Sequence, residues 1–163
     1  MSIFVHSFFM DKKSFTFDEI KLKLVNYCVY QDRCHYEVEQ KMKEFLLIPE
    51  AKEEIILYLI KENYLNEERF TRSYIRGKFY IKHWGRNKIK MNLKQKGIND
   101  KLISKCMDEI DKVDYEKTLT KIYQDYFSKQ NGMKEYQKKS KVIRYLMSKG
   151  YEYEEICEII NNE

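Results

Sequence analysis

Ten basic residues and no acidic residue lie between positions 69 and 99. Arginine forms paired hydrogen bonds to phosphate or carboxylate groups and lysine adds point charges, so this block is suited to binding a polyanion or an acidic protein surface. The net charge of the whole chain is only +5, so the residues outside the basic block carry a small net negative charge. Lys96 completes the block, and we expect its binding residues to be Arg69, Arg72, Arg76, Lys78, Lys82, Arg86, Lys88, Lys90 and Lys94.

The three leading arginines have the spacing of one helical stripe. Arg69, Arg72 and Arg76 fall at i, i+3 and i+7, whereas Phe70 and Phe79 fall on another side that can face a core. We therefore expect the guanidinium row to project freely. Reversing Arg72 and Arg76 to glutamate should then abolish binding while leaving helix content and melting nearly unchanged. The alternative is an ordinary solvated helix face, in which acidic residues would normally be interspersed.

The sequence does not decide the roles of two residues within the block. Trp84, the single tryptophan, precedes Gly85 at an expected helix junction, where core packing is the more common role and base stacking is the alternative. Gly77 lies inside a helical pattern and costs about 1 kcal/mol relative to alanine. It either permits a close helix approach or a bend, or it is an ordinary imperfection.

Residues that could carry catalysis or hold a metal form no recognisable site. Cys28, Cys34, His35 and His83 lack a standard zinc spacing, and Cys28 falls on an apolar stripe. Paired glutamates fall in first helical turns or on polar faces, where the helix dipole explains them. Glycine-rich phosphate loops and hydrolase motifs are missing. We expect no enzyme activity, no cofactor and no metal, and we expect the four cysteines to be reduced thiols of a cytoplasmic protein.

The elements that position the basic block are expected to be helices. Apolar residues recur at spacings of three and four along nearly the whole chain, which has one proline and five glycines among 163 residues. Ile89 and Leu93 recur 53 positions later as Val142 and Leu146, and a glycine follows four residues after each pair. This self-similarity predicts an all-α fold of three tandem three-helix repeats that form an elongated, curved helical array.

The repeats imply a division of the chain into four parts. The apolar start of the chain is too short to span a bilayer and lacks the pattern of a signal peptide, so no membrane contact is expected. A second possible start lies at Met10, so we expect the first nine residues to be a dispensable or disordered extension. The expected parts are an N-terminal extension at 1–16, helical repeat 1 at 17–64, the basic repeat 2 at 65–111 and repeat 3 at 112–163.

The central motif resembles a known family. Leu65–Arg72 (LNEERFTR), then Ile75-Arg76, Trp84-Gly85 and Lys96-Gly97-Ile98, is similar to the signature of RecX, a bacterial regulator of recombination. Weaker family patterns surround Val38 in the first repeat and Val142 in the third, and the resemblance covers residues 18 to 160. Thr71 departs from the family, which usually has alanine there, and the segment from 114 to 130 has little family character.

The resemblance implies a function without chemistry. RecX-type proteins bind the RecA recombinase filament along its groove, and they also associate with DNA. Strand exchange and DNA-dependent ATP hydrolysis would weaken because the filament is occupied. The alternative from the residues alone is a non-sequence-specific DNA-binding helical module that acts through its basic patch, and a third reading is a scaffold for an acidic protein. We expect a monomer.

Overall fold

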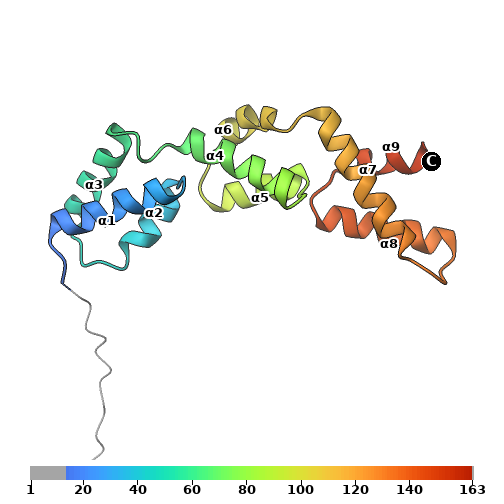
Figure 1. The fold of residues 1–163 in the computed structure, drawn as a ribbon, viewed down its shortest axis with the longest axis horizontal. Helices are drawn as coiled ribbons and strands as arrows, with labels where there is room; N and C mark the ends of the chain where they lie inside the picture. The colour runs from blue at the N-terminus through green and yellow to red at the C-terminus, as the bar shows by residue number, and fades with distance from the viewer. Residues whose placement is uncertain (1–13, 163) are drawn as a thin grey trace, which may run out of the picture. The chain divides into compact units, whose positions relative to one another are not determined.

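The computed structural model describes residues 14–162, and every regular element in that range is a helix (Figure 1). The predicted all-α class is confirmed. The expected extension at 1–16 lies almost wholly outside the described residues. The elements are α1 (Phe17–Tyr30), α2 (His35–Met42), α3 (Pro49–Lys61), α4 (Glu67–Arg76), the π-helical turn η1 (Gly77–Ile81), α5 (Arg86–Gln95), α6 (Asp100–Cys106), the 3-10 turn η2 (Met107–Glu109), α7 (Lys112–Ser128), α8 (Glu135–Ser148) and α9 (Tyr153–Asn161).

Local side-chain caps explain where several helices begin. Thr16 forms a capping box at the start of α1, and the side chains of Asn66 and Asn99 accept hydrogen bonds from backbone amides of α4 and α6. Asp111 caps α7, since its carboxylate accepts hydrogen bonds from two amides of the first turn at 2.8 and 3.0 Å.

Glycines in the left-handed region end two of the helices. Gly97 follows α5 with φ of +77°, and Gly150 follows α8 with φ of +94°. Gly77 behaves differently, because it has helical dihedrals and a Cβ there would meet no atom within 4 Å. Close helix approach is therefore not its role. It begins the π-helical turn instead.

The chain divides after Leu65 into two compact units. In the first unit, α1, α2 and α3 pack around a core that includes Leu24, Val38 and Ile55, each with no exposed surface. Leu46 follows Val38 and Met42 at helical spacing but does not belong to this core, because α2 ends at Met42 and the Leu46 side chain is 76% exposed.

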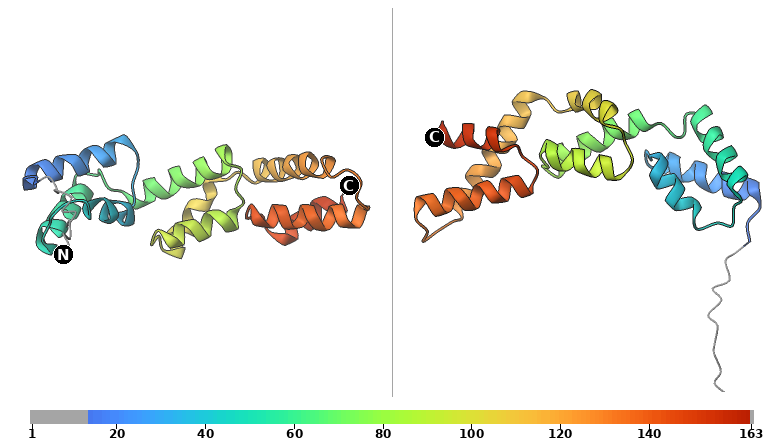
Figure 2. Two further views of the ribbon diagram at one scale, coloured as in Figure 1. Left: turned by 90° about the horizontal axis from the view of Figure 1, so that it is seen from below. Right: turned by 180° about the vertical axis from the view of Figure 1, so that it is seen from behind.

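The second unit contains two groups of three helices, α4–α6 and α7–α9 (Figures 1 and 2). Ile89 and Leu93 are fully buried in the first group, and Val142 and Leu146 are fully buried in the second. The residues that recur in the sequence are thus the core residues of each group. Within the second group, α7 and α8 lie side by side, as Figure 2 shows.

Backbone hydrogen bonds join the two groups of the second unit. The amide of Gly85, just before α5, donates to the Lys149 carbonyl at 2.8 Å, and the Asn87 amide donates to the Gly150 carbonyl at 2.9 Å. The buried Tyr151 hydroxyl donates to the His83 carbonyl at 3.0 Å. The N-terminus of α5 is thereby held against the C-terminal turn of α8.

Among residues 14–162, no helix combines the length and the apolar character that crossing a membrane requires.

Candidate functional site

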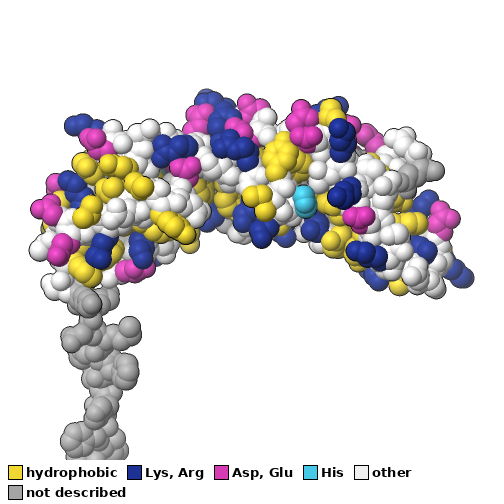
Figure 3. Space-filling view, in the orientation of Figure 1, with side chains coloured by type: hydrophobic (Ala, Val, Ile, Leu, Met, Phe, Trp, Pro, Cys, Tyr) yellow, Lys and Arg dark blue, Asp and Glu magenta, His cyan; other side chains and the backbone are white. Residues whose placement is uncertain are grey.

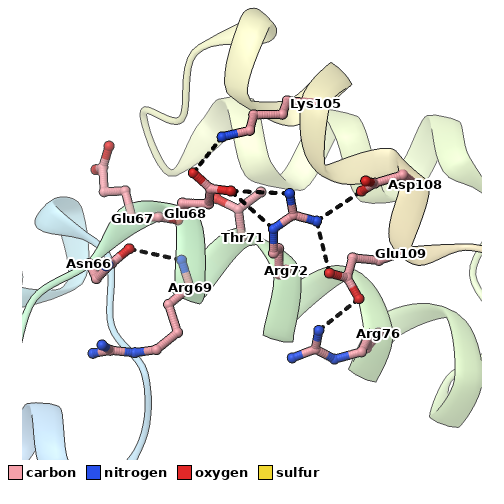
Figure 4. Close-up of polar contacts among 10 residues, drawn as sticks. All are labelled: Asn66, Glu67, Glu68, Arg69, Thr71, Arg72, Arg76, Lys105, Asp108 and Glu109. Carbon is pink, nitrogen blue, oxygen red and sulfur yellow. Dashed lines mark hydrogen bonds and ion pairs between the residues drawn. The ribbon is translucent and has the colours of Figure 1, made fainter.

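Arg72 lies at the centre of an ion-pair network in the α4–α6 group (Figure 4). Its guanidinium contacts Asp108 and Glu109 of η2 at 2.9 Å each, and Glu68, one turn back on α4, at 3.1 Å. Only 25% of the Arg72 side chain is exposed. These hydrogen bonds, from Glu109 first, raise the pKa of Arg72 above its ordinary value. Arg72 thus joins α4 to the turn that follows α6.

The network extends to neighbouring charges. Arg76 contacts Glu109 at 2.7 Å, and Lys105 of α6 contacts Glu68 at 2.8 Å. Hydrogen bonds from Arg76 and then Arg72 hold the pKa of Glu109 below its usual value. Hydrogen bonds from Lys105 and then Arg72 do the same for the pKa of Glu68. Both carboxylates are therefore stabilised in their charged form.

The expectation of a freely projecting arginine row is wrong for Arg72 and Arg76. The acidic partners Asp108 and Glu109 follow the basic block in sequence. They reach the arginines because α6 and η2 pack beside α4. For the same reason, reversing both arginines to glutamate should change stability, contrary to the sequence-based expectation. The third stripe residue, Arg69, extends its side chain away from this network in Figure 4.

Arg86 belongs to a second, partly buried network between the two helix groups. Its guanidinium contacts Glu155 of α9 at 2.9 Å and lies 3.7 Å from the centre of the Tyr115 ring. The Tyr115 hydroxyl accepts a hydrogen bond from the Arg86 amide and donates one to Glu152 at 2.5 Å. Burial, with the nearby Glu152 charge, raises the pKa of Glu155. Arg86 is placed to hold the groups together, and its side chain is 21% exposed.

Four lysines of the basic block have no acidic partner in the described part of the chain. Lys94 pairs with Asp100 at 2.8 Å across an exposed surface. Figure 3 shows Lys and Arg side chains interleaved with Asp and Glu where α4 and α6 lie, and Lys and Arg side chains with few acids nearby along α5. The block thus separates into a paired arginine side and an unpaired lysine side. The unpaired lysines are Lys78, Lys82, Lys88 and Lys90.

Two of these lysines lie over the ring of Trp84. The Lys78 ammonium is 4.7 Å and the Lys88 ammonium 4.5 Å from the centre of the indole. Lys78 also lies 5.1 Å from the centre of the Tyr74 ring. Trp84 is only partly buried, so it is not a core residue of the kind that its position suggested. The sequence pointed to Trp84, Lys78 and Lys88 separately but did not show that they meet, because the two lysines come from η1 and α5.

This arrangement can bind anions. An ammonium group carries three hydrogen-bond donors, which suits phosphate or carboxylate. Within residues 14–162, no three His, Cys, Asp or Glu side chains are grouped to hold a metal ion. The candidate functional site is therefore an interaction surface in the α4–α6 group.

Comparison with known proteins assigns both helix groups of the second unit. A model described as RecX, second three-helix domain, matches residues 66–107, and one described as RecX, third three-helix domain, matches residues 114–160. The chain belongs to the RecX family. The family resemblance and the three-helix organisation expected from the sequence are confirmed.

Individual relatives agree with this assignment. The regulatory protein RecX of Streptococcus uberis is 30% identical over 137 residues, which are 83% of this chain and 52% of that protein. That of Mannheimia succiniciproducens is 28% identical over 143 residues, 85% of this chain and 90% of that protein. The chain thus spans about half the length of the first relative and most of the second.

Solved structures share the fold. The crystal structure of RecX from Lactobacillus salivarius has a TM-score of 0.81 at 25% identity, covering 90% of this chain and 95% of that one. Another crystal structure of regulatory protein RecX also has a TM-score of 0.81, at 22% identity, and covers 90% of this chain and 73% of that one.

The one departure from the central family motif is accommodated inside this RecX-family fold. Thr71 is fully buried on α4. Its hydroxyl donates to the Glu67 carbonyl at 2.7 Å, so the extra polar group that threonine brings in place of alanine is satisfied within its own helix. Thr71 therefore gives no reason to expect a different function for the surface of α4.

Proposed function

We propose that this RecX-family chain binds the nucleoprotein filament of the RecA recombinase and lowers strand exchange and DNA-dependent ATP hydrolysis. It does so by occupying the filament, as a monomer in the cytoplasm, without chemistry of its own. Its relatives bear the name regulatory protein. The observation that carries the proposal is the set of unpaired lysines within the matched second domain: Lys78, Lys82, Lys88 and Lys90.

The lysines are better candidates for contact than the paired arginines. A partner that used Arg72 would have to replace its three carboxylate contacts, and it would leave those carboxylates without their main counter-ion. A partner that meets Lys82, which is exposed, breaks no ion pair within residues 14–162. We therefore assign Arg72, Arg76 and Arg86 to holding the surface together and the four lysines to meeting the partner.

A second candidate function, DNA binding in its own right, is supported by the same lysines. No Asp or Glu of the described residues pairs with them, and their positive charge favours a phosphate backbone as much as an acidic protein. In this case, binding to DNA without the recombinase would be independent of sequence and would fall steeply with salt concentration.

The proposal is tested by measuring the rate of ATP hydrolysis by the recombinase on single-stranded DNA while this protein is added in increasing amounts. We expect inhibition by the native chain and at least about ten-fold weaker inhibition by Lys82→Glu/Lys90→Glu, since charge reversal opposes association. The matched control is Lys117→Glu/Lys121→Glu on α7, which reverses two exposed lysines outside the proposed surface.

The result that would reject the proposal is a native chain that leaves the ATPase unchanged with the recombinase of the same cell. Equal weakening by the control pair would instead show that net charge, rather than the lysine side of the second domain, governs inhibition. Circular dichroism of each variant verifies that the helices remain.

A further inference from the structure

Two lysines lie over the ring of one tryptophan. Lys78 and Lys88 each lie within 5 Å of the centre of the Trp84 ring, and neither has an Asp or Glu partner among the described residues. The aromatic face attracts each cation, but the two like charges repel one another. An anion bound beside the ring would relieve that repulsion. The charge of the cluster therefore favours a negatively charged ligand.

Two departures from regular backbone create this cluster. The π-helical turn Gly77–Ile81 extends α4, and His83 then adopts a left-handed conformation with φ of +54°. The Trp84 amide donates to the Lys78 carbonyl at 3.0 Å, which brings the two residues together. Single π turns and non-glycine residues with positive φ persist mainly where the surroundings or a function require them. Here they place the indole beside Lys78.

We propose that Trp84, Lys78 and Lys88 form a binding site for single-stranded nucleic acid. A base stacks on the indole once the ammonium groups move off its face, and these two groups then pair with the flanking phosphates. Double-stranded DNA fits the site less well, because its base faces are covered by their neighbours. An acidic protein segment would satisfy the lysines but would leave the tryptophan without a stacking partner.

This inference deepens the proposed function, since a recombinase filament contains a single strand, but its test uses no recombinase. Failure of one proposal is therefore distinguishable from failure of the other. Trp84 is the only tryptophan in the chain, so its intrinsic fluorescence reports on this site alone. The probe is a thymidine oligonucleotide of about 20 nucleotides, titrated against the native full-length chain.

We expect saturable quenching of Trp84 fluorescence and a Kd at least about ten-fold higher for Lys78→Gln/Lys88→Gln. The matched control Lys117→Gln/Lys121→Gln removes the same charge from α7 and should leave the Kd within about two-fold. With a labelled oligonucleotide followed by anisotropy, Trp84→Leu should weaken single-strand binding roughly ten-fold, and Trp84→Phe should retain most of it.

The proposal is overturned if the oligonucleotide does not quench Trp84, or if quenching is unaffected by Lys78→Gln/Lys88→Gln. It is also overturned if a duplex of the same length binds as tightly as the single strand. Binding of a poly-glutamate peptide in place of the oligonucleotide would assign the surface to an acidic protein. The lysine variant keeps the tryptophan, so the test stands even if Trp84→Leu does not fold.

Discussion

Gly85 and Gly150 lie in direct backbone contact, although 65 positions separate them in the sequence. A Cβ on Gly85 would lie 2.2 Å from the Gly150 carbonyl carbon, and a Cβ on Gly150 would lie 2.3 Å from the Lys88 Cβ. Both positions therefore exclude any side chain. The contact joins the second and third three-helix domains at the start of α5, next to the Trp84 cluster.

Substituting Gly85 by alanine should loosen this junction. The new methyl group meets backbone atoms that cannot move independently, so we expect a loss of about 1–3 kcal/mol in the free energy of unfolding. Urea denaturation followed by circular dichroism measures it. Because the junction also positions Lys88, we expect the same variant to weaken the effect of the protein on the recombinase.

Gly77→Ala is the matched control for that substitution. Gly77 has helical dihedrals and open space around its missing Cβ, so alanine should leave stability unchanged or raise it by up to about 1 kcal/mol. A Gly85→Ala variant as stable as Gly77→Ala would contradict the tight junction.

Reversing the charge of Arg72 should destabilise the second domain. Glutamate at this position would face Glu68, Asp108 and Glu109, so one cation among three carboxylates becomes a group of four acids. We expect a lower Tm, with a smaller decrease for Arg72→Gln and with the difference between the two variants shrinking at high salt. A Tm equal to that of the native chain at low salt would mean that the network contributes nothing to stability.

The same network predicts how stability changes in acid. The pKa of Glu109, beside Arg76, and that of Glu68, beside Lys105, are both lower in the folded chain than their usual values. Their contribution is therefore complete above the unfolded pKa, near 4.3, and is lost as pH falls through the lower folded values. Urea denaturation between about pH 7 and about pH 3 should show this decrease.

The variant Arg72→Gln/Arg76→Gln serves as the comparison for the acid series. Without the guanidinium groups, the pKa of Glu109 returns toward its usual value, so the variant should lose less stability than the native chain over the acidic part of the range. Parallel curves for the two proteins would assign the acid sensitivity to other groups.

Features that depend on neighbouring residues were predictable from the sequence. The cap at Asn66 and the helix-ending Gly97 and Gly150 act within one turn of chain, so residue type and spacing identify them. The buried positions of the repeated helices, such as Ile89 and Val142, follow from apolar periodicity. The family motif around Arg69 is likewise recognisable from residues that lie close together in the sequence.

The partners of the charged side chains were not predictable in this way. Arg72 meets Asp108 and Glu109 more than thirty positions away, and Arg86 meets Glu155 at a separation of 69. The lack of acidic residues between positions 69 and 99 does not show whether the fold brings acidic residues of another helix to this segment. Arg72, Arg76 and Arg86, which the sequence predicted to form a contact surface, therefore form ion pairs within the chain.

The sequence by itself determined the all-α class, the three-helix organisation, the family and the position of the basic block, because each rests on local periodicity or on a contiguous motif. Only the tertiary structure decided which basic residues are neutralised and which stay unpaired. It also placed Lys78 and Lys88 at the Trp84 ring. The physical reason is that electrostatic interactions act through space between residues that the fold brings together, whatever their distance along the chain.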